Sequence, residues 1–316
     1  MFYDTCKGLF MQLFIIISIF LLFLCGPADA RPPLTVMTSI FPLLEFCQAV
    51  GKTQVSARLL LPPGTEPHSW EPNPSDLLML EQSDIFLMIG AGMEPWVADM
   101  VRVLNNGKLR VVEATALVPS EEEKKPDPDG GQGSLGHHDS HGDPHFWLNL
   151  AWDQDLIDQL VSLFASFDPA SAGFFRANGD EYKKKLQELD RRYKESLQGC
   201  RHRTFFVGGH AAYGHLASHY GLSQVSLYGI SPNADPTPRE MARVADQVKS
   251  EAVKYVFFET QVNNRLAKAL AMETGTDILL IRNGANPTRQ ELAEGVTFIS
   301  LMEENLKNLQ MALECQ

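Results

Sequence analysis

Three histidines of this sequence occur where a parallel α/β fold would present side chains for chemistry. His68 lies in PGTEPHSWEPNPSD, just after the apolar run QVSARLLL, and His210 follows the apolar run TFFVGG. In open parallel sheets, ligands bind beyond the carboxyl ends of the strands, so both side chains are expected at a cleft. His145 lies in GDPHFWLNL, where Pro144 and Phe146 restrict the imidazole. Imidazole nitrogens bind transition metals, so the three histidines form a candidate metal site. The alternative, that each is an ordinary core or surface residue, stays open on this pattern alone.

The segments that must position these histidines alternate between strand and helix patterns. Apolar runs predict strands at 34–40, 54–61, 85–90, 108–114, 204–209, 224–230, 254–259 and 277–281. Amphipathic or capped segments between them predict helices that begin near residues 43, 74, 94, 235, 263 and 298. This alternation is typical of α/β domains with parallel sheets. A chain of 316 residues is long for one core, so we expect two α/β lobes.

One long helix is expected between the two halves. Apolar residues recur at intervals of three and four through the charged stretch DEYKKKLQELDRRYKESL, namely at Tyr182, Leu186, Leu189, Tyr193 and Leu197. We place its start at Asp168 and Pro169, a pair typical of an N-cap followed by the first helical position. About thirty residues would span about 45 Å, enough to run along two lobes.

The N-terminus is typical of an exported protein. Lys7 precedes the apolar run LFMQLFIIISIFLLFLC, and small residues follow up to Ala28 and Ala30, which predicts a signal peptide with cleavage before Arg31. Lipidation at Cys25 is an alternative, and an uncleaved membrane anchor is another, although the run is only marginally long enough. We therefore divide the chain into a signal peptide (1–30), an N-terminal lobe (31–151) with a polar loop (119–143), a bridging helical segment (152–200) and a C-terminal lobe (201–316).

The remaining cysteines and the charge add two expectations. In an oxidising compartment Cys200 and Cys315 could pair, whereas Cys47 is expected to be a buried small hydrophobe. Pairing stays a hypothesis at this point. The net charge of -12 argues against a nucleic-acid partner, because phosphate binding requires concentrated Lys and Arg.

Four segments carry a resemblance to a known family. LLLPPGTEPHSWEPNPSD, DPHFWLNL, HAAYGHLASHYGL and FFETQVNNRLAKALAMETG resemble the zinc and manganese substrate-binding proteins of bacterial ABC importers, the ZnuA-like family. The match runs from about Pro33 to the C-terminus. The resemblance implies that His68, His145 and His210 are metal ligands and that the ion lies between two lobes bridged by a rigid helix. It also implies a periplasmic monomer, not an enzyme, that delivers zinc to an ABC permease and its ATPase and takes no small organic substrate.

The expected fourth ligand is missing from this sequence. Family members commonly supply an aspartate after the last C-terminal strand, where this chain has Arg282 and Asn283. Three imidazoles suit zinc better than manganese, which prefers carboxylate oxygens. Glu259 ends KYVFFE and is either a replacement ligand or a hydrogen-bond partner of a ligand imidazole. Glu66 is a weaker candidate and is expected to be a solvated loop charge.

The other histidines receive different predictions. His137, His138 and His141 lie in the polar loop and resemble the His-rich loop of zinc-binding family members, which implies a low-affinity collecting site; an inert linker is the alternative. His215 and His219 have the i, i+4 spacing of a helical zinc clasp but lack the adjacent Glu of metallohydrolases, so we expect them at the surface.

Two other functions remain open on the sequence. A zinc hydrolase would need a carboxylate base close to the metal, which Glu259 could supply, although no hydrolase motif accompanies it. An adhesin would fit an exported, lipid-anchored chain.

Overall fold

The computed structural model describes residues 32–104, 107–119, 142–230, 236–259 and 265–316. The predictions for the signal peptide, for Cys25 and for His137, His138 and His141 lie outside these residues. In the described part of the chain, no helix combines the length and apolarity that crossing a membrane requires.

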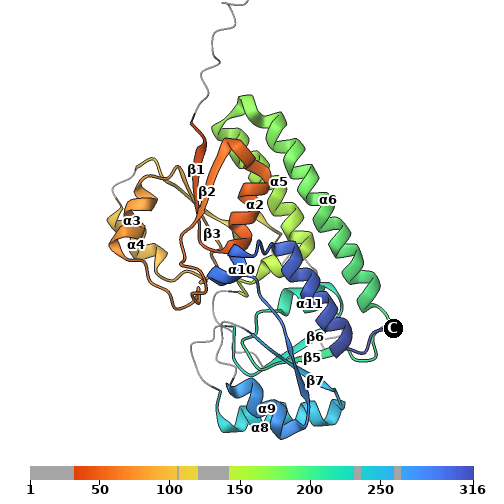
Figure 1. Cartoon of the computed structure of the whole chain (residues 1–316). Helices are drawn as coiled ribbons and strands as arrows, with labels where there is room; N and C mark the ends of the chain where they lie inside the picture. Colours follow the sequence, from red (N-terminus) through yellow and green to blue (C-terminus); the bar gives the residue numbers. More distant parts are fainter. Residues whose placement is uncertain (1–31, 105–106, 120–141, 231–235, 260–264) are drawn as a thin grey trace, which may run out of the picture. The chain divides into compact units, whose positions relative to one another are not determined.

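The first lobe is built on a parallel sheet with the strand order β2-β1-β3-β4. Its strands are β1 (Leu34–Thr38), β2 (Val55–Leu59), β3 (Ile85–Met88) and β4 (Arg110–Glu113). Its helices are α2 (Phe41–Gly51), α3 (Pro74–Glu81) and α4 (Val97–Val103). Helices α3 and α4 pack on one face of the sheet and α2 packs on the other (Figure 1). Every residue of β3 is therefore buried, as expected for a central strand covered on both faces.

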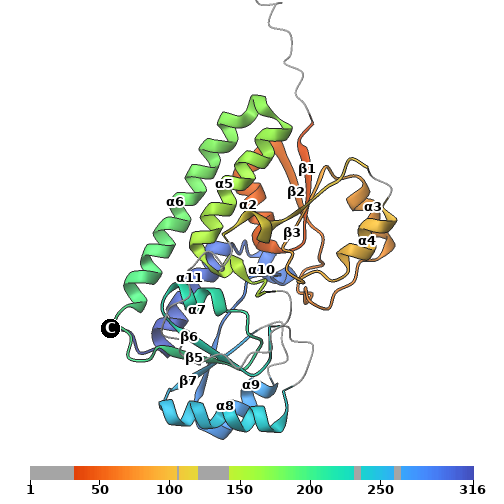
Figure 2. The same cartoon turned by 180° about the vertical axis from the view of Figure 1, so that it is seen from behind.

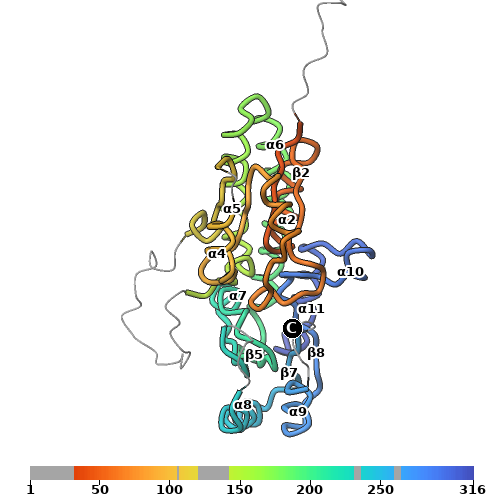
Figure 3. Tube along the Cα trace, turned by 90° about the vertical axis from the view of Figure 1, so that its left-hand side faces the viewer, coloured from red at the N-terminus to blue at the C-terminus, as the bar shows by residue number. Residues whose placement is uncertain are grey.

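The second lobe repeats this topology with the strand order β6-β5-β7-β8. Its strands are β5 (Thr204–Val207), β6 (Ser223–Ser226), β7 (Tyr255–Phe258) and β8 (Asp277–Leu280). Its helices are α7 (Gly214–His219), α8 (Pro238–Glu251), α9 (Arg265–Thr274), α10 (Arg289–Ala293) and α11 (Phe298–Ala312). Helices α8 and α9 lie side by side on one face (Figure 3), and α7 and α11 belong to the core on the other face (Figure 2). All predicted strands form, although each is shorter than its apolar run.

Two helices join the lobes. These are α5 (Leu150–Phe167) and α6 (Ala172–Leu197), and α6 has 26 residues, which corresponds to about 39 Å. Helix α6 packs against α5, against α2 of the first lobe and against α11 of the second lobe (Figure 1). The predicted apolar face is buried throughout, and the two-lobed α/β fold with a long bridging helix is confirmed. The predicted start of this helix at Asp168 and Pro169 is wrong. A short 3-10 turn, Pro169–Ser171, precedes α6, and the Asp168 side chain makes no cap hydrogen bond.

One hydrophobic core serves both lobes. A single cluster of buried side chains extends from β1 and α2 through α5 and α6 to β5, α7 and α11. A backbone hydrogen bond from Phe41 N to Ala285 O (2.7 Å) also joins the lobes. The loops that carry the candidate ligands therefore project from a continuous packed framework, in which large relative motions would open the core.

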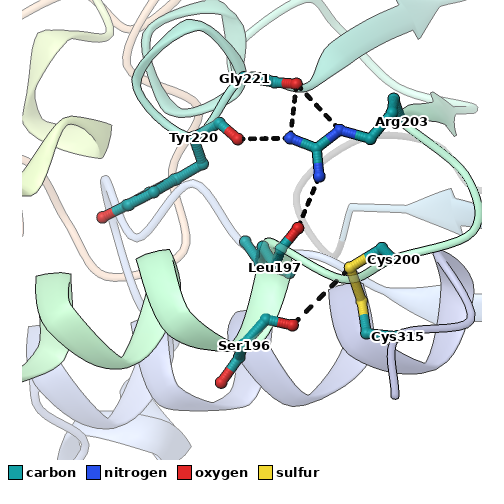
Figure 4. The surroundings of a disulfide bond; sticks show 7 residues. All are labelled: Ser196, Leu197, Cys200, Arg203, Tyr220, Gly221 and Cys315. Atoms are coloured by element: carbon teal, nitrogen blue, oxygen red, sulfur yellow. Dashed lines mark hydrogen bonds between the residues drawn. A yellow bond between two sulfur atoms is a disulfide. The ribbon is translucent and has the colours of Figure 1, made fainter.

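A disulfide closes the second lobe. Cys200, just after α6, is bonded to Cys315, just after α11, so the hypothesis of pairing is confirmed (Figure 4). Beside it the Arg203 guanidinium donates hydrogen bonds to the carbonyls of Leu197, Tyr220 and Gly221 (Figure 4). Cys47 is a fully buried free cysteine of α2, as predicted, and burial raises the pKa of its thiol.

Candidate metal centre

Three buried imidazoles converge through their Nε2 atoms. The Nε2 atom of His145 lies 3.1 Å from that of His68 and 3.3 Å from that of His210. Among the residues that the structure describes, these three form the only group of three or more His, Cys, Asp or Glu whose ligand atoms all lie within 4.8 Å of one another. Nitrogens bound to one tetrahedral zinc at about 2.0–2.1 Å are about 3.3 Å apart. The separations of His145 from its two partners therefore fit one tetrahedral ion.

The strand topology explains why His210 lies here. His210 follows β5 and Glu259 follows β7, and these neighbouring strands flank the point at which the strand order reverses. Side chains beyond the carboxyl ends of strands meet at such a switch point. Glu259 Oε2 accepts hydrogen bonds from both the backbone N (2.9 Å) and the Nδ1 (2.7 Å) of His210. This bond places the ring proton on Nδ1 and leaves the Nε2 lone pair directed at the site.

His145 is oriented in the same way by a closer neighbour. Asp143 Oδ1 accepts hydrogen bonds from the backbone N (3.0 Å) and the Nδ1 (2.7 Å) of His145. His215 of α7 donates from its Nε2 to the backbone carbonyl of Asp143 (2.9 Å), and its ring packs against Trp152. The second lobe thus supports the segment that carries His145.

His68 is held by a loop that the second lobe clamps. Asn286 Nδ2 donates hydrogen bonds to the carbonyls of Pro62 (2.7 Å) and Thr65 (2.9 Å). Gly64 N donates to Pro287 O (3.1 Å), and Gly64 has φ +79°, a conformation that favours glycine. The position of His68 therefore depends on residues more than two hundred positions away in the sequence.

The electrostatics of the site favour neutral imidazoles at two positions. Burial, together with the neighbouring imidazoles of His145 and His210, lowers the pKa of His68 to about 2. Burial also lowers the pKa of His145, against the opposing effect of Asp143. For His210, burial acts to lower the pKa, but the Glu259 carboxylate outweighs it and raises the pKa. A metal ion must therefore compete with a proton mainly at His210.

The region of the expected aspartate offers no carboxylate to the site. The Arg282 guanidinium pairs with Glu291 and Glu304. The backbone N of Arg282 donates a hydrogen bond to Asn305 Oδ1 (2.9 Å). The side-chain amide of Asn283 donates a long hydrogen bond to Glu259 Oε1 (3.5 Å). The backbone carbonyl of Asn283 accepts a hydrogen bond from the indole nitrogen of Trp147. Because Glu259 is already engaged by His210 and also accepts a hydrogen bond from Tyr213 (3.0 Å), the geometry favours the hydrogen-bond-partner interpretation over direct ligation.

Two sequence predictions are wrong. Glu66 is not a solvated loop charge: its Oε1 accepts the backbone N–H of His68 (3.1 Å), and its Oε2 is buried without a hydrogen-bond partner among the described residues. His215 is not at the surface but buried, because it packs beneath the Asp143 segment. His219 is half-buried and donates to Asp190 Oδ1 (2.8 Å).

Asp143 is the functional residue that sequence reasoning missed as a partner of His145. The available signal was a repeated pattern, because Glu66-Pro-His68 and Asp143-Pro-His145 both place an acid two residues before a candidate ligand. In both, the carboxylate accepts the backbone N–H of the histidine.

Comparisons with known proteins agree with this architecture. The family model described as "Zinc-uptake complex component A periplasmic" matches residues 36–312. The zinc-binding lipoprotein AdcA of Streptococcus pneumoniae is 31% identical over 300 residues, which cover 94% of this chain and 59% of AdcA. The chain thus spans about three fifths of that relative's length. The high-affinity zinc uptake system protein ZnuA of Bacillus subtilis is 30% identical, with 91% of this chain and 90% of that protein covered. The Zn(II)-bound ZnuA-like domain of S. pneumoniae AdcA superposes with a TM-score of 0.73 at 29% identity, covering 89% of this chain and 99% of the domain.

Proposed function

Because the chain belongs to the family of periplasmic zinc-uptake components A, we propose that it binds zinc outside the cytoplasmic membrane and delivers the ion to an ABC importer. The convergence of three buried Nε2 atoms is the observation that carries this proposal. The names of the relatives from S. pneumoniae and B. subtilis, a zinc-binding lipoprotein and a high-affinity zinc uptake protein, support it. The receiving partners are a membrane permease and its ATPase, and the protein acts as a monomer.

The zinc ligands are His68, His145 and His210. Asp143 and Glu259 hold two of these imidazoles by their Nδ1 atoms, which fixes the tautomer and raises the basicity of the ligand nitrogen. Three imidazoles and no carboxylate ligand favour zinc over manganese. The low-affinity collecting site in the loop with His137, His138 and His141 remains a separate proposal.

The carboxylate arrangement supports binding rather than hydrolysis. A zinc hydrolase requires a carboxylate free to take a proton from metal-bound water. Glu259, the candidate base, is engaged by His210 and Tyr213 through both of its oxygens. Zinc is therefore the cargo of the site, and its release requires a ligand to move or to accept a proton.

The test is a zinc titration of the purified protein and of two histidine variants. Wild type is expected to bind one zinc ion at the site and to prefer it to manganese in competition. His68→Ala should lose more affinity than the roughly 10–100-fold that loss of an outer hydrogen-bond partner costs. His219→Ala is the matched control, because His219 pairs with Asp190 away from the site, and should bind as wild type does. Full zinc affinity in His68→Ala, or a preference for manganese in wild type, would refute the proposal.

A further inference from the structure

A carboxylate oxygen with no hydrogen-bond partner in the described part of the chain is buried beside the three imidazoles. Glu66 uses one oxygen, Oε1, to accept the backbone N–H of His68 (3.1 Å). Its other oxygen, Oε2, is buried and accepts no hydrogen bond from the residues that the structure describes. A buried carboxylate oxygen is costly when it is left unpaired, so an unpaired one at a binding site points to a group that arrives with the ligand.

Comparison of the two acid-Pro-His segments shows what is particular to Glu66. In Asp143-Pro-His145, one aspartate oxygen binds both the backbone N and the Nδ1 of the following histidine. In Glu66-Pro-His68, the carboxylate accepts a hydrogen bond only from the backbone N of the histidine. Among the residues that the structure describes, no hydrogen bond joins it to the His68 ring. The Glu66 side chain is longer by one methylene group and directs its second oxygen elsewhere. The Glu66 carboxylate and the His210 imidazole, which belongs to the second lobe, are close enough to influence each other electrostatically.

The coordination geometry leaves one position for a further oxygen. Three imidazoles occupy three of the four positions of a tetrahedral zinc ion. Glu66 is not among the residues whose ligand atoms lie within 4.8 Å of one another, whereas ligands on one tetrahedral zinc lie about 3.3 Å apart. The carboxylate is thus too distant for direct ligation in this arrangement. A water molecule bound to zinc at the fourth position would supply a hydrogen-bond donor for the unpaired oxygen.

We propose that Glu66 is a positioning residue for the cargo: its Oε2 accepts a hydrogen bond from a water molecule that completes the coordination of zinc by His68, His145 and His210. The inference rests on the proposed function and deepens it. Zinc makes its bound water a strong hydrogen-bond donor, and a carboxylate is the strongest acceptor that a protein offers. The negative charge also offsets the charge of the ion inside a buried site.

The test compares Glu66→Gln with Glu71→Gln. The amide that replaces the Glu66 carboxylate retains an oxygen for the His68 backbone bond but loses the charge and directs an NH₂ donor toward the water. Glu71 belongs to the same loop and its side chain is exposed, so it is the matched control. Competition with a fluorescent zinc chelator should show an affinity about 10–100-fold lower for Glu66→Gln and unchanged for Glu71→Gln. Cobalt(II) absorption spectra should stay tetrahedral in both, because all three imidazoles remain.

The outcomes separate this inference from the proposed function. Equal zinc affinity of Glu66→Gln and wild type would overturn the role of Glu66 while leaving the three-histidine site intact. A zinc-loaded crystal structure with a Glu66 oxygen bound directly to the metal would also overturn it. If wild type itself failed to bind zinc, the proposed function would fail instead. Should Glu66→Gln fold poorly, Glu66→Asp provides the second variant: its shorter carboxylate should fall short of the water and lower the affinity, and unchanged affinity would contradict the proposal.

Discussion

Removal of the Cys200–Cys315 disulfide is expected to destabilise the second lobe strongly. The bond joins residues 115 positions apart, and the segment between them contains all four strands of the second sheet. For a loop of this length, the chain-entropy relation gives about 16 cal/mol/K, or about 4.8 kcal/mol at 25 °C, as the stabilisation through the unfolded state. The native fold should persist without the bond, because Arg203 still ties Leu197 to Tyr220 and Gly221.

The assay is urea unfolding of wild type and of the Cys200→Ser, Cys315→Ser double variant, with circular dichroism as the measure of the folded fraction. The free energy of unfolding should fall by several kcal/mol, up to about 4.8. Reductant should lower the stability of wild type in the same way and leave the double variant unchanged, which controls for the serines. Zinc affinity should not change, because Cys200 precedes β5 whereas His210 follows it at the opposite end of the strand. A loss below about 1 kcal/mol would show that the loop-entropy reasoning does not hold for this lobe.

Three further perturbations address the site and the core. Glu259→Gln should weaken zinc binding about 10–100-fold by loosening the Nδ1 bond of His210, and unchanged affinity in a chelator competition would count against the orienting role. Asn286→Ala removes two hydrogen bonds worth about 0.5–1.5 kcal/mol each, so zinc should dissociate about tenfold faster or more in stopped flow, and a wild-type rate would contradict the clamp. Asp153 is buried with both oxygens unpaired among the described residues, and burial raises its pKa well above the ordinary value. The folded state therefore keeps its proton above the unfolded pKa of about 3.9, and wild-type stability should fall by up to about 1.4 kcal/mol per pH unit relative to Asp153→Asn as pH rises toward the folded pKa. Equal pH slopes in urea titrations of the two proteins would be inconsistent with this assignment.

The fold was largely predictable because its signals are local. Apolar runs of the right length predict strands, and the three-and-four spacing from Tyr182 to Leu197 predicts the buried face of α6. The short helices α7 and α10 were missed, because five or six residues carry too little periodicity. The start of α6 was misplaced because Asp168 and Pro169 begin a 3-10 turn instead, which has the same capping signals.

From the sequence pattern alone, only those site residues were predictable that directly follow a predicted strand. His68 and His210 follow strands, so topology alone suggested them, whereas His145 follows no strand and required the family resemblance. The roles of the carboxylates depend on distant pairings that no local pattern encodes. Glu259 accepts a hydrogen bond from His210, which lies 49 positions away in the sequence. The loop that contains Glu66 is hydrogen-bonded by Asn286, which lies more than two hundred positions away.

The three ligands differ in how firmly they are held, and this difference indicates the order of release. His145 and His210 each have a carboxylate on Nδ1 and a place next to a helix or a strand of the continuous core. His68 lies in the irregular segment between β2 and α3, and its loop is held by the Asn286 side chain and a backbone bond to Pro287. Opening of this loop breaks a few hydrogen bonds, whereas separation of the lobes would expose the shared core. We therefore expect zinc to leave through displacement of His68, with the other two imidazoles kept in place.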